Sequence, residues 1–218
     1  MTSAPSNPDD SEAPADDAAL IAAAAAQLVE YVDEQGVVID VVTRAEMRDR
    51  ALRHRSVYIA VVDDQQRLLV HKRADWKDVF PGAWDLAFGG VCDVGEDWET
   101  SAHRELFEEA GVRGELVDLG AVAFEAPGVA LVGRFYVCTH NGPFHFNDGE
   151  VTATQWVPLD ELATFVAVND VPPDSAQIVT SDAIMAVERR RVPANNTKLG
   201  RSDSVDETHQ TRNDRGDS

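Results

Sequence analysis

The sequence predicts an α/β or α+β domain, in preference to an all-β barrel, from three observations. Runs rich in β-branched residues alternate with helical segments along the middle of the chain, an order typical of layered helices and strands. A helix predicted over residues 98–110 repeats apolar side chains every four residues. The length of 218 residues suits one domain of average size with a tail at each end.

Polar tails are expected on both sides of this domain. Residues 1–17 contain no large apolar side chain after Met1, so burial cannot offset the entropy of ordering them. The Ala-rich stretch 18–29 predicts a short helix, because Ala has the highest helix propensity. The predicted divisions are a largely disordered acidic and Ala-rich tail over 1–26, a folded domain over 27–193 and a disordered polar tail over 194–218.

The folded domain is predicted to begin with a hairpin and a short helix. Two β-rich runs, 28–32 and 37–42, flank a turn that ends in a glycine. Thr43 and Glu46 have the spacing of a capping box, in which each side chain bonds the other residue's backbone amide. A helix is therefore expected from Thr43 to about Arg53.

Strands and helices continue to alternate along the rest of the domain. A second hairpin is predicted from strands 57–62 and 67–72, and strand 84–88 precedes the long helix. After that helix, the same patterns predict strands over 114–125, 130–140 and 152–158 and helices over 159–165 and 175–190.

The helix over 98–110 carries an acidic face that indicates a bound cation. Glu105, Glu108 and Glu109 are three or four residues apart or adjacent, so they share one side of the helix and repel by about 0.2–0.5 kcal/mol per pair. A divalent ion converts this repulsion into attraction, and Mg²⁺ prefers hard oxygen ligands completed by water and phosphates. The ordinary alternative is a solvated face stabilised by pairs such as Arg104 with Glu108.

The residues around this helix support a built site. Arg104 lies eight residues after Glu96, close enough to bridge back to it and brace the incoming loop. Gly111 follows the last apolar residue and suits a left-handed helix cap. The loop glycines permit close backbone approaches and positive φ, and they are Gly89, Gly90 and Gly95.

These residues resemble the signature of the Nudix family. Gly90, Glu96 and the run from Arg104 to Val112 match G-x5-E-x7-R-E-U-x-E-E-x-G-U at every defined position. The flanking segments HRSVYIAVV, KDVFPGAWD, GPFHFNDGEVTATQWVPLDEL and VPPDS are similar to the Nudix subgroup related to isopentenyl-diphosphate isomerase. The resemblance therefore covers about residues 27–193.

The resemblance implies an α/β/α sandwich with a mixed sheet and a catalytic loop and helix. It implies hydrolysis of a diphosphate linkage in a nucleoside diphosphate derivative or a related small molecule, with Mg²⁺ or Mn²⁺. By the same resemblance, Glu105, Glu108, Glu109 and the carbonyl of Gly90 would be the metal ligands. Glu96 and Arg104 would hold the geometry of the site.

The resemblance leaves the base and the substrate contacts open. Family members differ in the carboxylate that deprotonates water, and we favour Glu105 with Glu150 as the alternative, because Glu150 precedes a strand where many members place a distal acid. A solvated loop glutamate is an equally good interpretation of Glu150. Arg73 and Lys77 are candidates for binding substrate phosphates, although surface cations are common.

Two other functions remain as alternatives. The isomerase moves a double bond by proton transfer and would need a Cys just before the first box glycine, where this chain has Gly89, with Cys92 three residues later. His54 corresponds to a metal histidine of the isomerase, but a structural role is expected. The third possibility is a non-catalytic Nudix module that senses a nucleotide, since a fold alone does not define a function.

The composition limits the classes of binding partner and the cellular compartment that we expect. A formal net charge of −20 at pH 7 opposes binding to polymeric nucleic acid or an anionic membrane, so we expect a small-molecule partner. Two cysteines without metal-ligand spacing indicate reduced thiols, and no secretory or membrane-spanning segment is recognised. The protein is therefore expected in the cytoplasm, with a homodimer as a possible assembly because dimers are common in the family.

Overall fold

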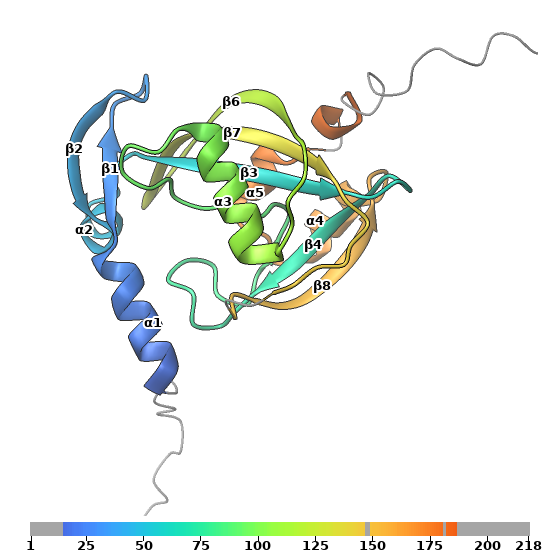
Figure 1. The fold of residues 1–218 in the computed structure, drawn as a ribbon, viewed down its shortest axis with the longest axis horizontal. Helices are drawn as coiled ribbons and strands as arrows, with labels where there is room; N and C mark the ends of the chain where they lie inside the picture. The colour runs from blue at the N-terminus through green and yellow to red at the C-terminus, as the bar shows by residue number, and fades with distance from the viewer. Residues whose placement is uncertain (1–14, 147–148, 181, 187–218) are drawn as a thin grey trace, which may run out of the picture.

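An eight-stranded mixed sheet lies between helices (Figure 1). The structure is a computed structural model that describes residues 15–146, 149–180 and 182–186. The elements in chain order are α1 (Ala15–Ala26), β1 (Leu28–Val32), β2 (Val38–Thr43), α2 (Arg44–Asp49), β3 (His54–Val62), β4 (Arg67–Arg73), β5 (Trp84–Asp85), α3 (Trp98–Ala110), β6 (Leu116–Ala126), β7 (Val129–Thr139), β8 (Val151–Pro158), α4 (Leu162–Val168) and α5 (Pro173–Ile178).

The sheet combines antiparallel pairs with one parallel pair, which confirms the predicted mixed sheet. Its main path is β2-β1-β3-β4-β5, while β7 pairs with β3 and β6, and β8 pairs with β4. Strands β3 and β7 are parallel from His54 opposite Leu131 to Val62 opposite Thr139. The other strand pairs are antiparallel.

The predicted second hairpin has the expected turn but a short ladder. Within the described part of the chain, β3 and β4 pair only at Val62 and Leu68. Along the rest of this edge β3 bridges to Phe88 and Val91, while β4 pairs with β5. The two strands therefore separate where residues 84–91 enter between them, since these residues pair first with β4 and then with β3.

Alternate side chains of β3 enter two cores on opposite faces of the sheet. Val57, Ile59 and Val61 pack in the core that contains the apolar stripe of α3. The side chains between them pack in the core that contains residues of α4 and α5. Figure 1 shows α3 in front of the β3–β7 region and α5 behind it. This arrangement is the expected sandwich, and it fixes α3 against the sheet.

The N-terminal hairpin and α2 form a smaller unit next to α1. Val29, Val42 and Met47 are buried together with Val91. The amide of Glu46 donates to Thr43 Oγ1 at 3.2 Å, as the capping box predicts. Helix α2 ends at Asp49, earlier than the predicted Arg53.

The Ala-rich stretch is helical, but its predicted end was wrong. α1 ends at Ala26, and residues 28 and 29 belong to β1. Residues 28 and 29 form backbone hydrogen bonds with β2. In a longer helix, the last backbone carbonyl groups would have no partner within the helix. Residues 1–14, part of the predicted N-terminal tail, lie outside the described residues.

Three further boundaries differ from the predictions. The predicted strand 84–88 pairs with β4 only over Trp84–Asp85, because the Asp85 carboxylate accepts the Leu86 amide at 2.9 Å and turns the backbone. The helix predicted over 159–165 starts at Leu162. The helix predicted over 175–190 is divided into α5 and a helical segment at 182–186 by extended backbone at Val179, and residues 187–218 lie outside the described chain.

Candidate active site

Capping residues stabilise both ends of helix α3. The Asp97 side chain accepts the Thr100 amide at 2.9 Å and caps the first turn. Gly111 has φ 68° and ψ 15°, the left-handed conformation that ends many helices. Ala102, Leu106 and Ala110 are completely buried. The helix therefore cannot rotate, and its glutamates face fixed directions.

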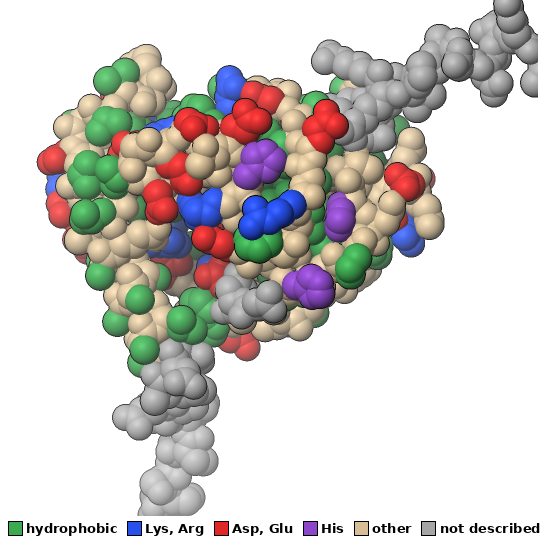
Figure 2. Space-filling model, in the orientation of Figure 1, with side chains coloured by type: hydrophobic (Ala, Val, Ile, Leu, Met, Phe, Trp, Pro, Cys, Tyr) green, Lys and Arg blue, Asp and Glu red, His purple; other side chains and the backbone are tan. Residues whose placement is uncertain are grey.

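Two of the three helix glutamates are buried beside the glycine loop. The Glu105 side chain is 13% exposed, and Glu109 is 7% exposed. Glu109 accepts the Gly89 amide at 2.8 Å. A Cβ added to Gly90 would lie 3.0–3.2 Å from the Glu105 carboxylate, so a side chain there would crowd this carboxylate. Acidic side chains also appear across the surface that carries α3 (Figure 2).

Burial and mutual repulsion disfavour the charged forms of both glutamates. Burial raises the pKa of Glu105 to about 7, although Arg104 opposes this shift. Burial also raises the pKa of Glu109 well above its ordinary value, and the charges of Glu105 and Glu150 raise it further. A cation placed between these carboxylates would offset the repulsion.

Arg104 connects the helix to the incoming loop. Its Nη2 donates to the Glu96 carboxylate at 2.9 Å, the contact expected from the spacing. Its Nη1 donates to Glu105 at 2.9 Å and to Glu108 at 3.0 Å. Although burial opposes it, hydrogen bonds from Arg104 and Ser101 keep the pKa of Glu96 below its ordinary value. Glu108 itself is exposed over 54% of its side chain.

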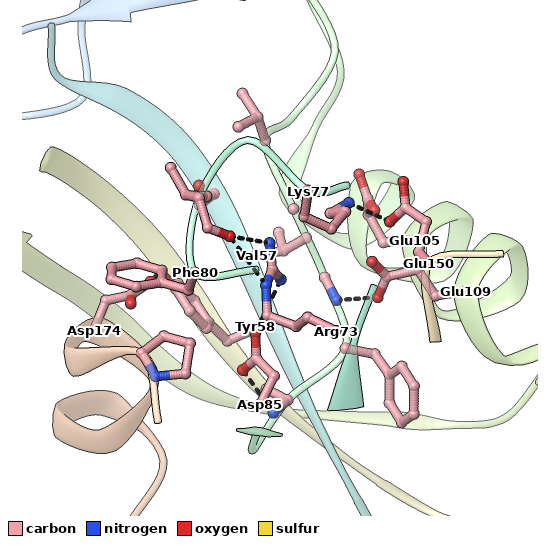
Figure 3. Close-up of a pocket in the computed structure, with 18 of the residues that line it drawn as sticks. Val57, Tyr58, Arg73, Lys77, Phe80, Asp85, Glu105, Glu109, Glu150 and Asp174 are labelled. Atoms are coloured by element: carbon pink, nitrogen blue, oxygen red, sulfur yellow. Dashed lines mark hydrogen bonds and ion pairs between the residues drawn. The ribbon is translucent and has the colours of Figure 1, made fainter. Parts of the chain in front are cut away.

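The distal acid Glu150 reaches the same site from the start of β8. Its carbonyl accepts the Ala74 amide at 2.8 Å, which anchors it beside the end of β4. Its carboxylate forms an ion pair with Lys77. Figure 3 shows Glu105, Glu109 and Glu150 together, with Lys77 beside them. The structure therefore brings the predicted acids and one predicted cation into one place.

These residues form one side of a cavity of about 390 Å³. Arg73 lies between its two sides, and Phe80 and Asp174 lie on the side opposite the glutamates (Figure 3). Arg73 donates to Asp85 at 3.2 Å and to the Val79 carbonyl at 3.0 Å. Both predicted substrate cations, Arg73 and Lys77, therefore line the cavity and already have acidic partners.

The donor set suits a hard divalent cation by its chemistry. The glutamates at 105, 108, 109 and 150 all line the cavity and offer carboxylate oxygens, which Mg²⁺ and Mn²⁺ prefer. Within the described residues, no three His, Cys, Asp or Glu side chains are already gathered as a metal site. Glu105 contacts Arg104 and Glu150 contacts Lys77 instead. The Gly90 carbonyl, another predicted ligand, accepts the Val57 amide at 3.0 Å and keeps one lone pair.

Two residues relevant to the isomerase alternative are buried. Cys92 is 1% exposed in the core beneath α3, and burial raises the pKa of its thiol to about 11. His54 lines the cavity but is buried, and this burial lowers its pKa to about 4. Its Nδ1 lies 3.2 Å from the Leu52 carbonyl.

Several cavity residues were not identified from the sequence. Tyr58 donates to Asp174 at 2.7 Å, a contact between residues 116 positions apart that no local pattern indicates. Arg44 and Arg48 also line the cavity. Their spacing of four residues on a capped helix was a usable signal, since it places both on one face.

Comparison with known proteins identifies the family. The family model described as the NUDIX domain matches residues 52–180. An uncharacterized Nudix hydrolase of Yersinia pestis is 35% identical over 159 residues, which cover 72% of this chain and 86% of that protein. One from Pseudomonas aeruginosa is also 35% identical and is covered over 93% of its length.

Solved structures agree on the fold. A Deinococcus radiodurans crystal structure superimposes with a TM-score of 0.60 and 25% identity, covering 69% of this chain and 96% of that one. A MutT protein from Methanosarcina mazei has a TM-score of 0.51 and 20% identity, covering 65% and 96%. None of the helices described here has the length and apolar composition required to cross a lipid bilayer. With its loop and acidic helix assembled as the sequence motif requires, the chain belongs to the Nudix hydrolase family.

Proposed function

We propose that the protein hydrolyses a diphosphate linkage in a nucleoside diphosphate derivative or a related small molecule, using Mg²⁺ or Mn²⁺. The observation that carries this proposal is the buried pair Glu105 and Glu109 on the wall of the cavity. Glu105, Glu108, Glu109 and the Gly90 carbonyl would hold the metal. When bound, the cation would neutralise phosphate charge and polarise the attacking water.

The protein's own residues would complete the reaction. Glu105 is proposed to take a proton from water as the water oxygen bonds to phosphorus, while the leaving phosphate oxygen keeps the electron pair of the broken bond. Glu150 is the alternative base, because its carboxylate lines the same cavity. Glu96 and Arg104 would position Glu105, and Arg73 and Lys77 would contact the substrate phosphates.

The expected partner is a small molecule. The net charge of −20 disfavours a polymeric nucleic acid, and the cavity of about 390 Å³ is of a size typical for small ligands.

The buried thiols of Cys92 and Cys138 support a reducing, cytoplasmic location. The resemblance of the flanking segments supports membership of the isomerase-related subgroup, and a homodimer remains the proposed assembly.

Hydrolysis is tested with Mg²⁺ and a panel of nucleoside diphosphate sugars, dinucleoside polyphosphates, oxidised nucleotides and isoprenyl diphosphates. Glu105→Gln is expected to lower kcat by about two orders of magnitude, because it removes a carboxylate from charge stabilisation. Glu99→Gln is the matched control, since Glu99 is on the same helix with 76% of its side chain exposed. Equal turnover by Glu105→Gln and the native protein would remove Glu105 from the mechanism.

The same panel of substrates distinguishes hydrolysis from the isomerase and sensor functions. Formation of an allylic isomer without phosphate release would indicate the isomerase, and tight nucleotide binding without turnover would indicate a sensor. Cys92→Ser should leave hydrolysis nearly unchanged, because Cys92 is buried in the core beneath α3. An inactive Cys92→Ser protein with native circular dichroism would return the thiol to the mechanism.

A further inference from the structure

A second basic cluster lies on the wall of the same cavity, away from the sequence motif. Arg44 and Arg48 are one turn apart on α2, and both line the cavity. Their side chains are only 17% and 22% exposed. Both also line an adjoining cavity of about 170 Å³ beside α1 and residues 76–78. The pair therefore lies where the N-terminal unit borders the cavity that the glutamates line.

The cluster has more positive than negative charge. Asp78 is the single carboxylate that forms ion pairs with either arginine in the part of the chain that is described. Arg44 Nε lies 3.3 Å and Arg48 Nε 3.5 Å from the same oxygen of Asp78. His54 lines the same cavity and supplies no negative charge. Two guanidinium groups therefore share one carboxylate oxygen.

One donor of Arg48 is also left without a hydrogen bond, although the residue forms an ion pair with Asp78. Its Nε is buried without a hydrogen-bond partner among the described residues. Arg73 and Arg104, which line the same cavity, each donate hydrogen bonds to carboxylates. Burial lowers the pKa of Arg48, and the charge of Arg44 lowers it further. A buried donor that makes no hydrogen bond is costly, and the 3.5 Å ion pair with Asp78 does not satisfy it, so the site favours an additional acceptor.

We propose that Arg44 and Arg48 bind a second phosphate group of the substrate, on the part of the molecule that is not cleaved. Guanidinium groups match phosphate oxygens in geometry and keep their charge when buried. This assignment rests on the proposed function, since the diphosphate would occupy the glutamate side of the cavity. The substrate class is then a diphosphate compound that carries a further phosphate monoester.

The first test measures anion binding without metal or turnover. Inorganic phosphate is titrated by calorimetry into the full chain in the presence of EDTA. We expect binding that is weakened about tenfold or more in Arg48→Gln, because one charge-assisted hydrogen bond to the phosphate is lost. Arg48→Lys, which keeps the charge, should bind more tightly than Arg48→Gln.

Arg50→Gln, at the C-cap of the same helix, provides the matched control. Arg50 is 54% exposed and pairs with Glu46, and it does not line the cavity. We expect its phosphate affinity to equal that of the native protein. Equal affinity of the native protein and a folded Arg48→Gln would overturn the arginine site, as would a native protein that binds no phosphate.

The second test compares substrates that differ by one phosphate monoester, namely NADP⁺ with NAD⁺ and coenzyme A with dephospho-coenzyme A. For a pair that is hydrolysed, kcat/KM should favour the phosphorylated member about tenfold, and Arg48→Gln should abolish this preference through KM. An unchanged preference in Arg48→Gln would overturn the proposal. Failure of the protein to hydrolyse any diphosphate would overturn the proposed function, whereas the phosphate titration judges the arginine site separately.

Discussion

Glu109 belongs to the acidic face that the sequence spacing predicts, but its carboxylate is buried where the charged form is unfavourable. Its carboxylate is 7% exposed and accepts one backbone hydrogen bond, from Gly89. Because its folded-state pKa is raised, the native protein holds this proton more tightly than the unfolded chain does. The associated stability is present below the unfolded pKa, about 4.3, and is lost as the pH rises through the folded pKa.

We predict that Glu109→Gln stabilises the metal-free protein at pH 8. The amide can still accept the Gly89 hydrogen bond but carries no charge, and each unit of pKa elevation corresponds to about 1.4 kcal/mol. Urea denaturation in EDTA should show a higher unfolding free energy than that of the native protein at pH 8, and the difference should become smaller at pH 5. Loss of stability at pH 8 would contradict a charge penalty at Glu109.

The same variant should lose the response to metal. Mg²⁺ should raise the melting temperature of the native protein, because binding to the folded state stabilises it. This increase should be absent or much reduced in Glu109→Gln and retained in Glu99→Gln, which alters an exposed glutamate of the same helix. A full Mg²⁺ response in Glu109→Gln would remove Glu109 from the metal ligands.

At the scale of the element, the C-terminal cap of α3 determines where the acidic helix ends. Gly111 donates its amide to Phe107 at 2.9 Å in a left-handed conformation. The His145 amide then donates to the Ala110 carbonyl at 2.9 Å, which joins the helix end to the segment after β7. An added Cβ at Gly111 would lie 2.8 Å from His145 Cβ. The cap therefore requires glycine for both conformation and space.

We predict that Gly111→Ala destabilises the protein by about 2–3 kcal/mol, from left-handed strain of about 1 kcal/mol plus the steric conflict. Gly128→Ala is the matched control, because Gly128 has φ 85° and no atom within 4 Å of an added Cβ. It should lose only about 1 kcal/mol. Urea denaturation measures both changes, and equal losses would show that the contact with His145 is unimportant.

For the whole molecule, coverage of both sheet faces buries histidines that would otherwise titrate near pH 6.5. His71 on β4 is 3% exposed and stacks on Phe88 with ring centroids 4.5 Å apart. Burial lowers its pKa to about 4. Because the folded pKa is depressed, the unfolded chain takes up the proton first, and stability is lost as the pH falls from 6.5 towards 4.

We predict that His71→Phe removes part of this acid sensitivity. The ring can keep its stacking on Phe88 without an ionisable nitrogen. Relative to the native protein, its unfolding free energy should be higher at pH 4.5 than at pH 8 by about 2–3 kcal/mol. His103→Gln is the control, since His103 is 44% exposed. A relative stability that does not depend on pH would show that the pKa of His71 is the same in the folded protein as in the unfolded chain.

Local patterns in the sequence determined the helix and its acids. The four-residue apolar stripe and Gly111 predicted α3 as Trp98–Ala110, because helical periodicity and capping depend on neighbours in the chain. The Arg104 contact with Glu96 followed from spacing for the same reason. The mixed α/β class also followed from the order of strand and helix patterns.

Tertiary structure alone decided what the helix faces. The parallel pairing of β3 with β7, and the entry of residues 84–91 between β3 and β4, join segments that are distant in the sequence, so their free energy belongs to the whole molecule. The cavity joins α2, the end of β4, α3 and residues near α5. Whether Arg48 Nε has a hydrogen-bond acceptor depends on which groups of these elements lie near it in space. The spacing of residues along the chain does not predict those distances.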